Sequence, residues 1–212
     1  MAYGIAEFWA SRVTWNVSAD QYQLLNIMGP DEYNWPVNNS AYCNVVAQKS
    51  LQFAIQAAQL LGNSYPSVWD DIVNKLDIPL DTERQIHPEY DGYINQTVKQ
   101  ADTVLLAYPF GLSMPANVRQ NDLAFYEAVT DQGGPAMTWA MFALGWLDQG
   151  NDTKAADLFP LTYANNVNEP FQVWSEVVHG GGAANFVTGA GGFLQLLING
   201  YGGARVNAQI EY

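Results

Sequence analysis

The segment 40–61 constrains the fold of this chain more than any other stretch, because its side chains separate onto two opposed faces at helical spacing. Apolar residues recur every three or four positions along one face, and lysine and glutamine side chains occupy the other. Asn39 or Ser40 can cap the start of this helix, and Gly62 can end it. A long helix with one apolar face has to pack against other elements, so a layered domain is expected.

Helical patterns also dominate the rest of the chain. One helix is expected to begin at the first residues, and the spacing predicts others over 66–76, 97–107, 116–130, 135–149, 152–163 and 186–199. The last nine residues alternate like a short strand. Four connections stand out, at 16–39, 78–96, 108–115 and 164–185. Structureless connections longer than about 12–15 residues are uncommon unless they are functional or disordered, and the aromatic and carboxylate side chains here favour function. These patterns predict an all-α domain built from antiparallel helix hairpins.

The composition favours a folded chain that binds neutral ligands. Hydrophobic residues make up 49% of the 212 residues and charged residues 14%, so the chain can bury a core. A net charge of −13 repels phosphate backbones and anionic lipids, so neither nucleic acid nor a membrane is an expected partner. The 7 Trp, 12 Tyr and 9 Phe rings can stack on sugar faces, while amides and carboxylates bind hydroxyls, which suits a carbohydrate substrate.

The sequence contains no motif for a metal or a nucleotide cofactor. Cys43 is the single cysteine, and with only His87 and His179 besides, a Cys/His metal site is not expected. The phosphate-binding loop, the dinucleotide-binding glycine motif and the nucleophile elbow are all missing. The run Gly180–Gly182 could place backbone N–H groups near an anion, although a flexible turn is the simpler interpretation. The sequence therefore predicts neither a cofactor nor a metal.

The first candidate site is the segment 29–33, in which a Gly-Pro turn precedes two adjacent carboxylates and an aromatic ring. The ring of Tyr33 and nearby apolar side chains could raise the pKa of Asp31 or Glu32, as a general acid requires near neutral pH. A surface turn capped by Asp31 is the alternative, and spacing alone favours neither interpretation.

Two further segments carry candidate residues. Glu176 follows Trp174 in an expected loop, where it is either catalytic or paired with a basic side chain. Lys99 lies at the start of an expected helix, where a cation opposes the helix dipole. It can donate hydrogen bonds to substrate hydroxyls, or it can form a salt bridge with Asp102 or Glu89.

Glu32 and Glu176 are expected on separate loops of a helical scaffold, which is an arrangement that suits an inverting glycosidase. In such enzymes one carboxyl group protonates the leaving oxygen and the other activates water, and the two lie about 6.5–9.5 Å apart. The sequence therefore predicts that both glutamates face one cavity.

Five motifs, taken in order along the chain, resemble glycoside hydrolase family 65. The motifs are 29–33 with 37–45, 99–109, 134–139, 169–176 and 191–195, and the similarity covers nearly the whole chain. The family includes acid trehalases, kojibiose and maltose phosphorylases, and glucosidases that act on glucosylgalactosylhydroxylysine. The segments 37–40 and 87–93 bring the chain nearer to those glucosidases than to the trehalases.

The resemblance implies a barrel fold. The family fold is an (α/α)6 barrel of six helix hairpins, so residues 1–205 would form the C-terminal portion of that barrel. Residues 206–212 would begin a C-terminal β segment. The chain then looks like a fragment of the catalytic domain, and a partial barrel would expose apolar faces that the complete barrel covers.

The resemblance also implies roles for particular residues. Glu32 matches the general acid of the family, and Glu176 matches the general base of its hydrolases. Lys99 and Gln100 match a pair that binds the non-reducing glucose. Further substrate-binding positions are expected at Asp31, Tyr33 and Trp174. The implied reaction is inverting hydrolysis of an α-linked glucose in a glucosyl disaccharide, without a cofactor.

Two other functions fit the same sequence. The first is a trehalase or a disaccharide phosphorylase, although the segment 179–184 lacks the Ser or Thr hydroxyls with which phosphorylase members bind phosphate. The second is a catalytically inactive carbohydrate-binding or structural fragment, because a Trp-Asp segment that helps to grip glucose in the family is missing. The compartment is left open, since the family resemblance suggests the cytoplasm and four N-glycosylation acceptor patterns suggest secretion or the lysosome.

Overall fold

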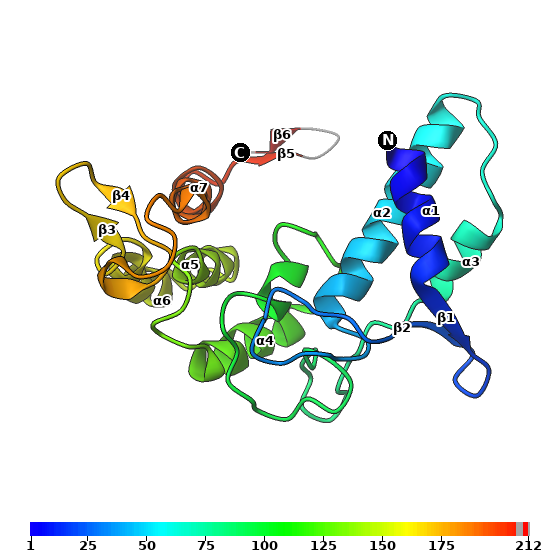
Figure 1. Cartoon of the computed structure of the whole chain (residues 1–212), viewed down its shortest axis with the longest axis horizontal. Helices are drawn as coiled ribbons and strands as arrows, with labels where there is room; N and C mark the ends of the chain where they lie inside the picture. The colour runs from blue at the N-terminus through cyan, green and yellow to red at the C-terminus, as the bar shows by residue number, and fades with distance from the viewer. Residues whose placement is uncertain (207–209, 212) are drawn as a thin grey trace.

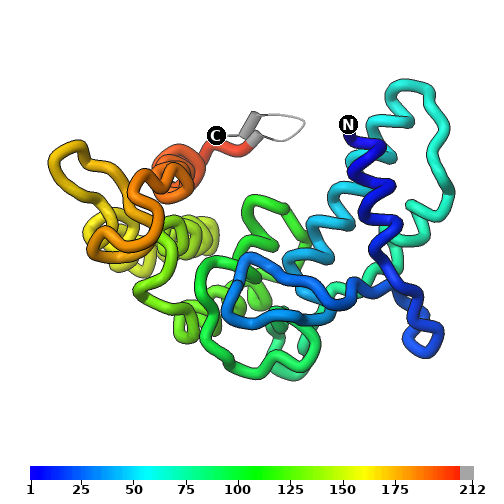
Figure 2. The backbone as a smooth tube through the Cα atoms, in the orientation of Figure 1, coloured from blue at the N-terminus to red at the C-terminus, as the bar shows by residue number. Residues whose placement is uncertain are grey.

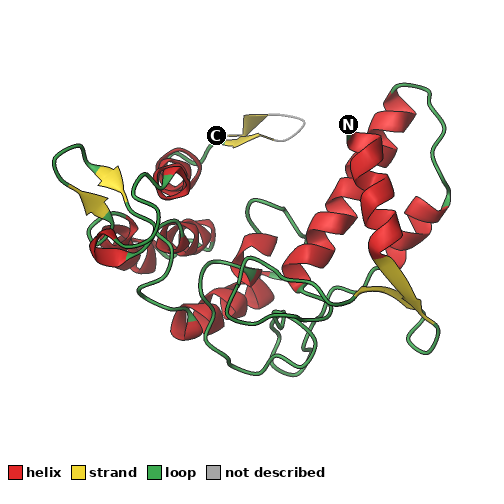
Figure 3. Ribbon diagram, in the orientation of Figure 1, coloured by secondary structure: helices red, strands yellow, loops and turns green. Residues whose placement is uncertain are grey.

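The computed structural model describes residues 1–206, 210 and 211, and most of the regular structure is helical (Figures 1 and 3). The α-helices are α1 (Ala2–Arg12), α2 (Ala41–Leu60), α3 (Val68–Lys75), α4 (Ala116–Val129), α5 (Thr138–Asp148), α6 (Asp152–Leu158) and α7 (Val187–Gln195). Short helical segments are η1 (Thr103–Leu106), η2 (Phe159–Thr162), η3 (Val178–Gly180) and the π-helical η4 (Leu196–Tyr201).

Three antiparallel ribbons of two strands each accompany the helices. They pair β1 (Val13–Asn16) with β2 (Gln21–Leu24), β3 (Val167–Asn168) with β4 (Val173–Trp174), and β5 (Arg205–Val206) with β6 (Ile210–Glu211). The chain is therefore helix-rich. The expected all-α class did not include these three ribbons. The single strand expected at the end of the chain is a hairpin, whose residues 207–209 and 212 lie outside the described part.

Local signals place most helices correctly. Ser40 caps α2, since its Oγ accepts a hydrogen bond from the N–H of Cys43 at 3.3 Å, and Gly62 follows the helix with φ of 67°. The helix expected over 97–107 is wrong, because only η1 forms there. The backbone before η1 makes tertiary bonds instead: Val98 pairs with residues 129 and 131 on either side of the end of α4.

Two groups of helices, each with its own core, stand at opposite ends of the molecule (Figures 1 and 2). In the first group α1, α2 and α3 enclose Leu51, Trp69 and Ile72. In the second group α5 is buried along almost its whole length among α4, α6, α7 and η4, with Phe142 and Leu144 fully enclosed. The long connections 25–40 and 77–102 lie between the two groups.

Both helix groups leave large apolar side chains uncovered. These are Tyr3, Ile5, Phe8, Phe53, Leu60 and Leu61 in the first group, and Leu194, Leu197, Ile198 and Tyr201 in the second. Leu61 continues the apolar spacing of the helix predicted over 40–61, yet it lies just after α2 and is exposed. Exposed apolar clusters of this kind mark surfaces that another protein segment or ligand covers. In the described part of the chain, no helix has the length and apolar character needed to cross a bilayer.

Candidate active site

The loop that carries Glu32 is held firmly at its base. Ile27 and Val37 exchange two backbone hydrogen bonds of 2.9 Å, which close the loop like a bridge. Inside it the buried Asp31 carboxylate accepts hydrogen bonds from the N–H of Tyr33 at 3.0 Å and from the side chain of Asn34 at 2.7 Å. These bonds turn the Asp31 side chain inward and leave the next side chain, that of Glu32, pointing away from the core with about half of it exposed (51%).

Lys99 and Gln100 meet this loop. The N–H of Lys99 donates to Asp31 at 2.8 Å, and its ammonium group forms an ion pair with Glu32. The amide of Gln100 donates to the carbonyl of Pro30. The salt bridge of Lys99 is thus to Glu32, and not to Asp102 or Glu89.

The surroundings of Glu32 differ from the apolar enclosure suggested by the sequence. The neighbouring side chains of Met28 and Tyr33 are about half exposed, and the group that faces the Glu32 carboxylate is the Lys99 ammonium. The hydroxyl of Tyr33 donates to Asp131 at 2.7 Å, and this hydrogen bond raises the pKa of Tyr33. Tyr33 therefore presents a neutral ring on the open side of the loop.

Glu176 lies just beyond β4, in a loop that folds back on it. Its N–H donates to the carbonyl of Ala183 at 2.9 Å, and its carboxylate accepts from the N–H of Ala183 at 3.0 Å. Gly182 has φ of 68°, and a Cβ atom at that position would lie 2.7 Å from the Cβ of Glu176. The glycine run 180–182 therefore forms a tight turn. The N–H of Ala183, which follows the run, contacts an anionic group as well, namely the carboxylate of Glu176.

The segment 131–136 connects the two candidate loops. Asp131 accepts the Tyr33 hydroxyl, and Gly134 packs so closely that a Cβ atom there would lie 2.1 Å from the carbonyl oxygen of Lys99. At the other end, the N–H of Ala136 donates to the carbonyl of Glu176 at 2.8 Å. The two ends of this six-residue segment lie at most roughly 18 Å apart, so the Glu32 loop and the Glu176 loop contact one short segment. The separation of their carboxyl groups, about 6.5–9.5 Å for inverting chemistry, stays a prediction.

Two of the expected substrate-binding side chains are held by other protein groups. Asp31 is fully buried and has accepted three hydrogen bonds, so it supports the loop from below. Trp174 donates from its ring nitrogen to the carbonyl of Thr162 at 3.1 Å and packs against Phe193, with 5.5 Å between ring centroids. In this arrangement Trp174 supports β4 and α7, and contact with substrate stays a prediction for both residues.

Asp131 and Asn34 are site residues that the sequence analysis missed. Asp131 is marked by its position just before the Gly133–Gly134 turn, where its carboxylate also accepts the N–H of Gly133 at 2.8 Å. Asn34 carries no comparable signal, because its bond to Asp31 depends on how the loop folds. Both residues orient the loops and leave the two glutamates as the acid–base candidates.

A cavity of about 250 Å³ lies next to the Glu32 loop. It is mostly apolar and is lined by Pro30, Tyr42, Ala101, Leu105, Pro109, Met137, Met141, Thr188, Gly192 and Gln195. Pro30 and Ala101 are the direct neighbours of Asp31 and Gln100, so the cavity adjoins the candidate site. Its lining offers few hydrogen-bonding groups for a sugar.

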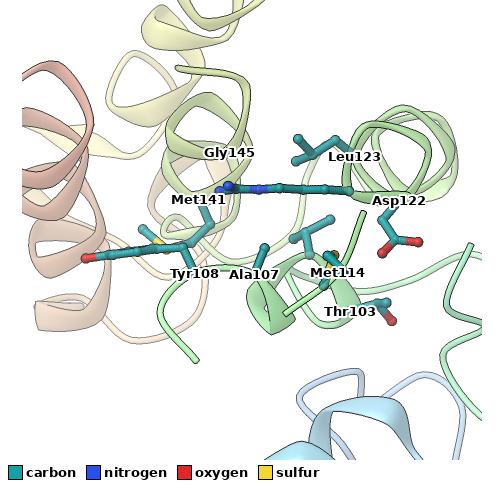
Figure 4. Close-up of a pocket in the computed structure, with 10 residues that line it drawn as sticks. Thr103, Ala107, Tyr108, Met114, Asp122, Leu123, Met141 and Gly145 are labelled. Carbon is teal, nitrogen blue, oxygen red and sulfur yellow. The ribbon is translucent and has the colours of Figure 1, made fainter. Parts of the chain in front are cut away.

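A second cavity lies between η1, α4 and α5 and is far too small for a sugar (Figure 4). Its volume is about 10 Å³, which holds roughly one water molecule. Thr103 and Arg119 line it, and each has a buried polar atom without a partner among the described residues. A volume of this size leaves no room for a substrate, so this cavity belongs to the structural core.

Metal-binding side chains do not gather in the described part of the chain, where no three His, Cys, Asp or Glu residues form a suitable group. The lone thiol of Cys43 is half-buried, and burial raises its pKa to about 11. Cys43 is therefore a neutral thiol near pH 7.

The fold is shared with a solved carbohydrate-active protein. The structure of a candidate kojibiose phosphorylase from the human microbiome matches with a TM-score of 0.77 over 97% of this chain and 35% of that chain, at 16% sequence identity. Residues 1–97 match the model of the glycosyl hydrolase family 65 central catalytic domain. Together with the five motifs in order along the sequence, this match relates the chain to glycoside hydrolase family 65.

Curated relatives cover nearly the whole chain. A protein-glucosylgalactosylhydroxylysine glucosidase of Danio rerio is 50% identical over 99% of this chain and 32% of its own length. The enzyme of the same name from Dictyostelium discoideum is 45% identical over 96% and 29%, and a kojibiose hydrolase of Flavobacterium johnsoniae is 39% identical over 96% and 30%. The chain thus spans about a third of the length of these relatives.

Proposed function

We propose that this chain forms part of the catalytic domain of an inverting glycoside hydrolase. The observation that carries the proposal is the meeting of the Glu32 loop and the Glu176 loop on the segment 131–136, with Lys99 paired to Glu32. The relatives named as glucosylgalactosylhydroxylysine glucosidases support the substrate class, a glucose α-linked in a glucosylgalactosyl unit on hydroxylysine. A collagen-like chain is the corresponding macromolecular substrate.

Each glutamate has one task in this mechanism. Glu32 protonates the glycosidic oxygen, and Glu176 takes a proton from the water that attacks the opposite face of the glucose. Substrate hydroxyls that accept hydrogen bonds from Lys99 and Gln100 would draw the Lys99 ammonium away from Glu32. That exchange favours the protonated carboxyl that the first step requires.

The chain fits the C-terminal portion of an (α/α)6 barrel. Residues 1–205 would supply its helix hairpins, and residues 206–212 would begin a C-terminal β segment. The apolar side chains left exposed on α1, α2 and η4 support this assignment, because the remaining barrel helices would cover them. The full-length gene product is therefore the protein in which activity should be measured.

A panel of glucosyl disaccharides separates this proposal from its alternatives. We expect the full-length protein to release glucose from glucosylgalactosylhydroxylysine without phosphate. Turnover that requires phosphate would indicate a phosphorylase, and preference for trehalose would indicate a trehalase. Binding without turnover of any member of the panel would favour an inactive carbohydrate-binding protein.

The stereochemistry of the first product tests the two-carboxylate mechanism. Inversion of an α-linkage is expected to give β-glucose, which then equilibrates with the α-anomer. Proton NMR spectra taken in the first minutes of the reaction distinguish the two anomers. Initial α-glucose would mean retention, and Glu176 could not then be a general base.

Gln100→Ala is expected to weaken glucose binding. The Gln100 amide donates one N–H to the Pro30 carbonyl. Among the described residues, its second N–H and its carbonyl oxygen form no hydrogen bond, so both can bind a sugar hydroxyl. We expect kcat/KM to fall by about 1–3 kcal/mol, mainly through KM, as for a lost buried hydrogen bond. Steady-state kinetics test this, with the exposed Gln120→Ala as the control. A fall confined to kcat would contradict a binding role.

A further inference from the structure

Three carboxyl groups lie buried directly behind the candidate acid. Asp31 lies in the connection 25–40, Glu89 and Asp102 lie in the connection 77–102, and each is at most 3% exposed. One oxygen of Asp102 accepts the N–H of Asp31 at 2.9 Å, and a Cβ atom on Gly29 would lie 2.8 Å from that oxygen. Such close packing ties the Asp102 side chain to the backbone of the Glu32 loop.

Asp31 is the centre of this group, and both of its carboxyl oxygens accept hydrogen bonds. It accepts the N–H groups of Tyr33 and Lys99 and the side chain of Asn34 at 2.7–3.0 Å. These bonds set the backbone on both sides of the Glu32–Lys99 ion pair, since Asp31 precedes Glu32 and holds Lys99 directly. A change at Asp31 would therefore move both members of the pair.

Glu89 is the second buried carboxyl of this group, and one of its oxygens has no hydrogen-bond partner among the described residues. That oxygen is the buried Oε2, and the carboxyl of Asp31 is a neighbouring acceptor. Two ionised carboxylates in this contact would repel each other in a poorly solvated site. A protonated Glu89 removes the repulsion and becomes a fourth donor to Asp31.

We propose that Glu89 is a positioning residue that carries a proton and donates it in a hydrogen bond to Asp31, which thereby holds Glu32 and Lys99 in their reactive arrangement. This inference rests on the proposed hydrolase function. It assigns Glu89 to the support of the acid rather than to proton transfer with the substrate.

The charges around Glu89 agree with a neutral carboxyl. The groups that face it are the carboxyls of Asp31 and Asp102 and the phenols of Tyr90, Tyr93 and Tyr126. Burial and these carboxylates raise the pKa of Glu89 to about 10, and burial raises that of Asp102 to about 7. The pKa of Glu89 is higher in the folded than in the unfolded chain. The stabilisation that Glu89 contributes is therefore complete below about pH 4.5 and is lost as the pH rises towards 10.

Substitution of Glu89 tests the proposal, because glutamine resembles the protonated acid. In the full-length protein, Glu89→Gln is expected to keep kcat within about threefold of the wild type. Glu89→Ala removes the fourth donor to Asp31 and is expected to lower kcat by roughly 5- to 100-fold. The exposed Glu83→Gln in the same loop is the matched control. A Glu89→Gln variant as inactive as Glu89→Ala would overturn the proposal.

Two readouts do not depend on turnover. Infrared difference spectra of the wild type minus Glu89→Gln near pH 7 are expected to show a protonated carboxyl band from Glu89, while a band from Asp102 would be common to both proteins. Amide hydrogen exchange over 29–34 should accelerate between pH 7 and 10 beyond the intrinsic rate, and this excess should be absent in Glu89→Gln. Absence of the band would overturn the inference. A protein that shows the band but hydrolyses no glucoside would refute the proposed function and leave the proton on Glu89 established.

Discussion

Glu176→Gln is expected to remove hydrolysis of every glucoside substrate, whatever its leaving group. A general base contributes about 10²–10⁴-fold to the rate, and water attack cannot be avoided by a better leaving group. Azide, which needs no deprotonation, is expected to restore part of the reaction and to give a β-glucosyl azide. Measured kcat values for natural and activated substrates, with and without azide, decide this.

Glu32→Gln should behave differently, and the contrast assigns the two roles. Loss of the general acid is expected to slow the natural disaccharide by about 10²–10⁴-fold while activated glucosides with good leaving groups keep much of their rate. Glu169→Gln, an exposed position in the ribbon that precedes Glu176, is the matched control and should leave kcat unchanged. Equal losses for both substrates in Glu32→Gln would contradict its role as the acid.

Asp122→Ala is expected to have the largest effect on stability. The buried Asp122 carboxylate accepts hydrogen bonds from the backbone N–H and from the ring of His87, each at 2.7 Å. The hydroxyl of Tyr126 donates to the carbonyl of His87. These bonds attach the loop that leads to Glu89 to helix α4. Breaking a buried pair of this kind costs roughly 3–5 kcal/mol, because the remaining polar groups lose their partner.

Amide hydrogen exchange over 84–90 and 118–126 measures this effect in the full-length protein. Protection is expected to fall by on the order of 10²–10³-fold in Asp122→Ala. Asp122→Asn should recover part of the loss, since an amide keeps one acceptor and can donate to the imidazole. The exposed Asp157→Ala should change stability by less than about 0.5 kcal/mol. Unchanged protection in Asp122→Ala would mean that other contacts hold the loop.

The helical framework could be predicted from the sequence because its signals are local. The stripe of α2, the Ser40 cap and the glycines after α2 and α5 depend on residues within a few positions of one another. The same reasoning fails at 97–107, where N–H groups that could form a helix bond instead to Asp31 and Val129, which are distant in sequence.

The motifs of the candidate site were likewise visible in the sequence, and the family resemblance suggested which glutamate would act as acid and which as base. How these residues meet was not visible, because it depends on contacts across long stretches of chain. Asp131 joins the Glu32 loop 98 residues away, and Lys99 pairs with Glu32 across 67 residues. Residue types and local spacing therefore determine the helices and the candidate chemistry. Only the tertiary structure decides which side chains are buried, as for Asp31 and Glu89, because burial and long-range hydrogen bonds depend on the packing of distant segments.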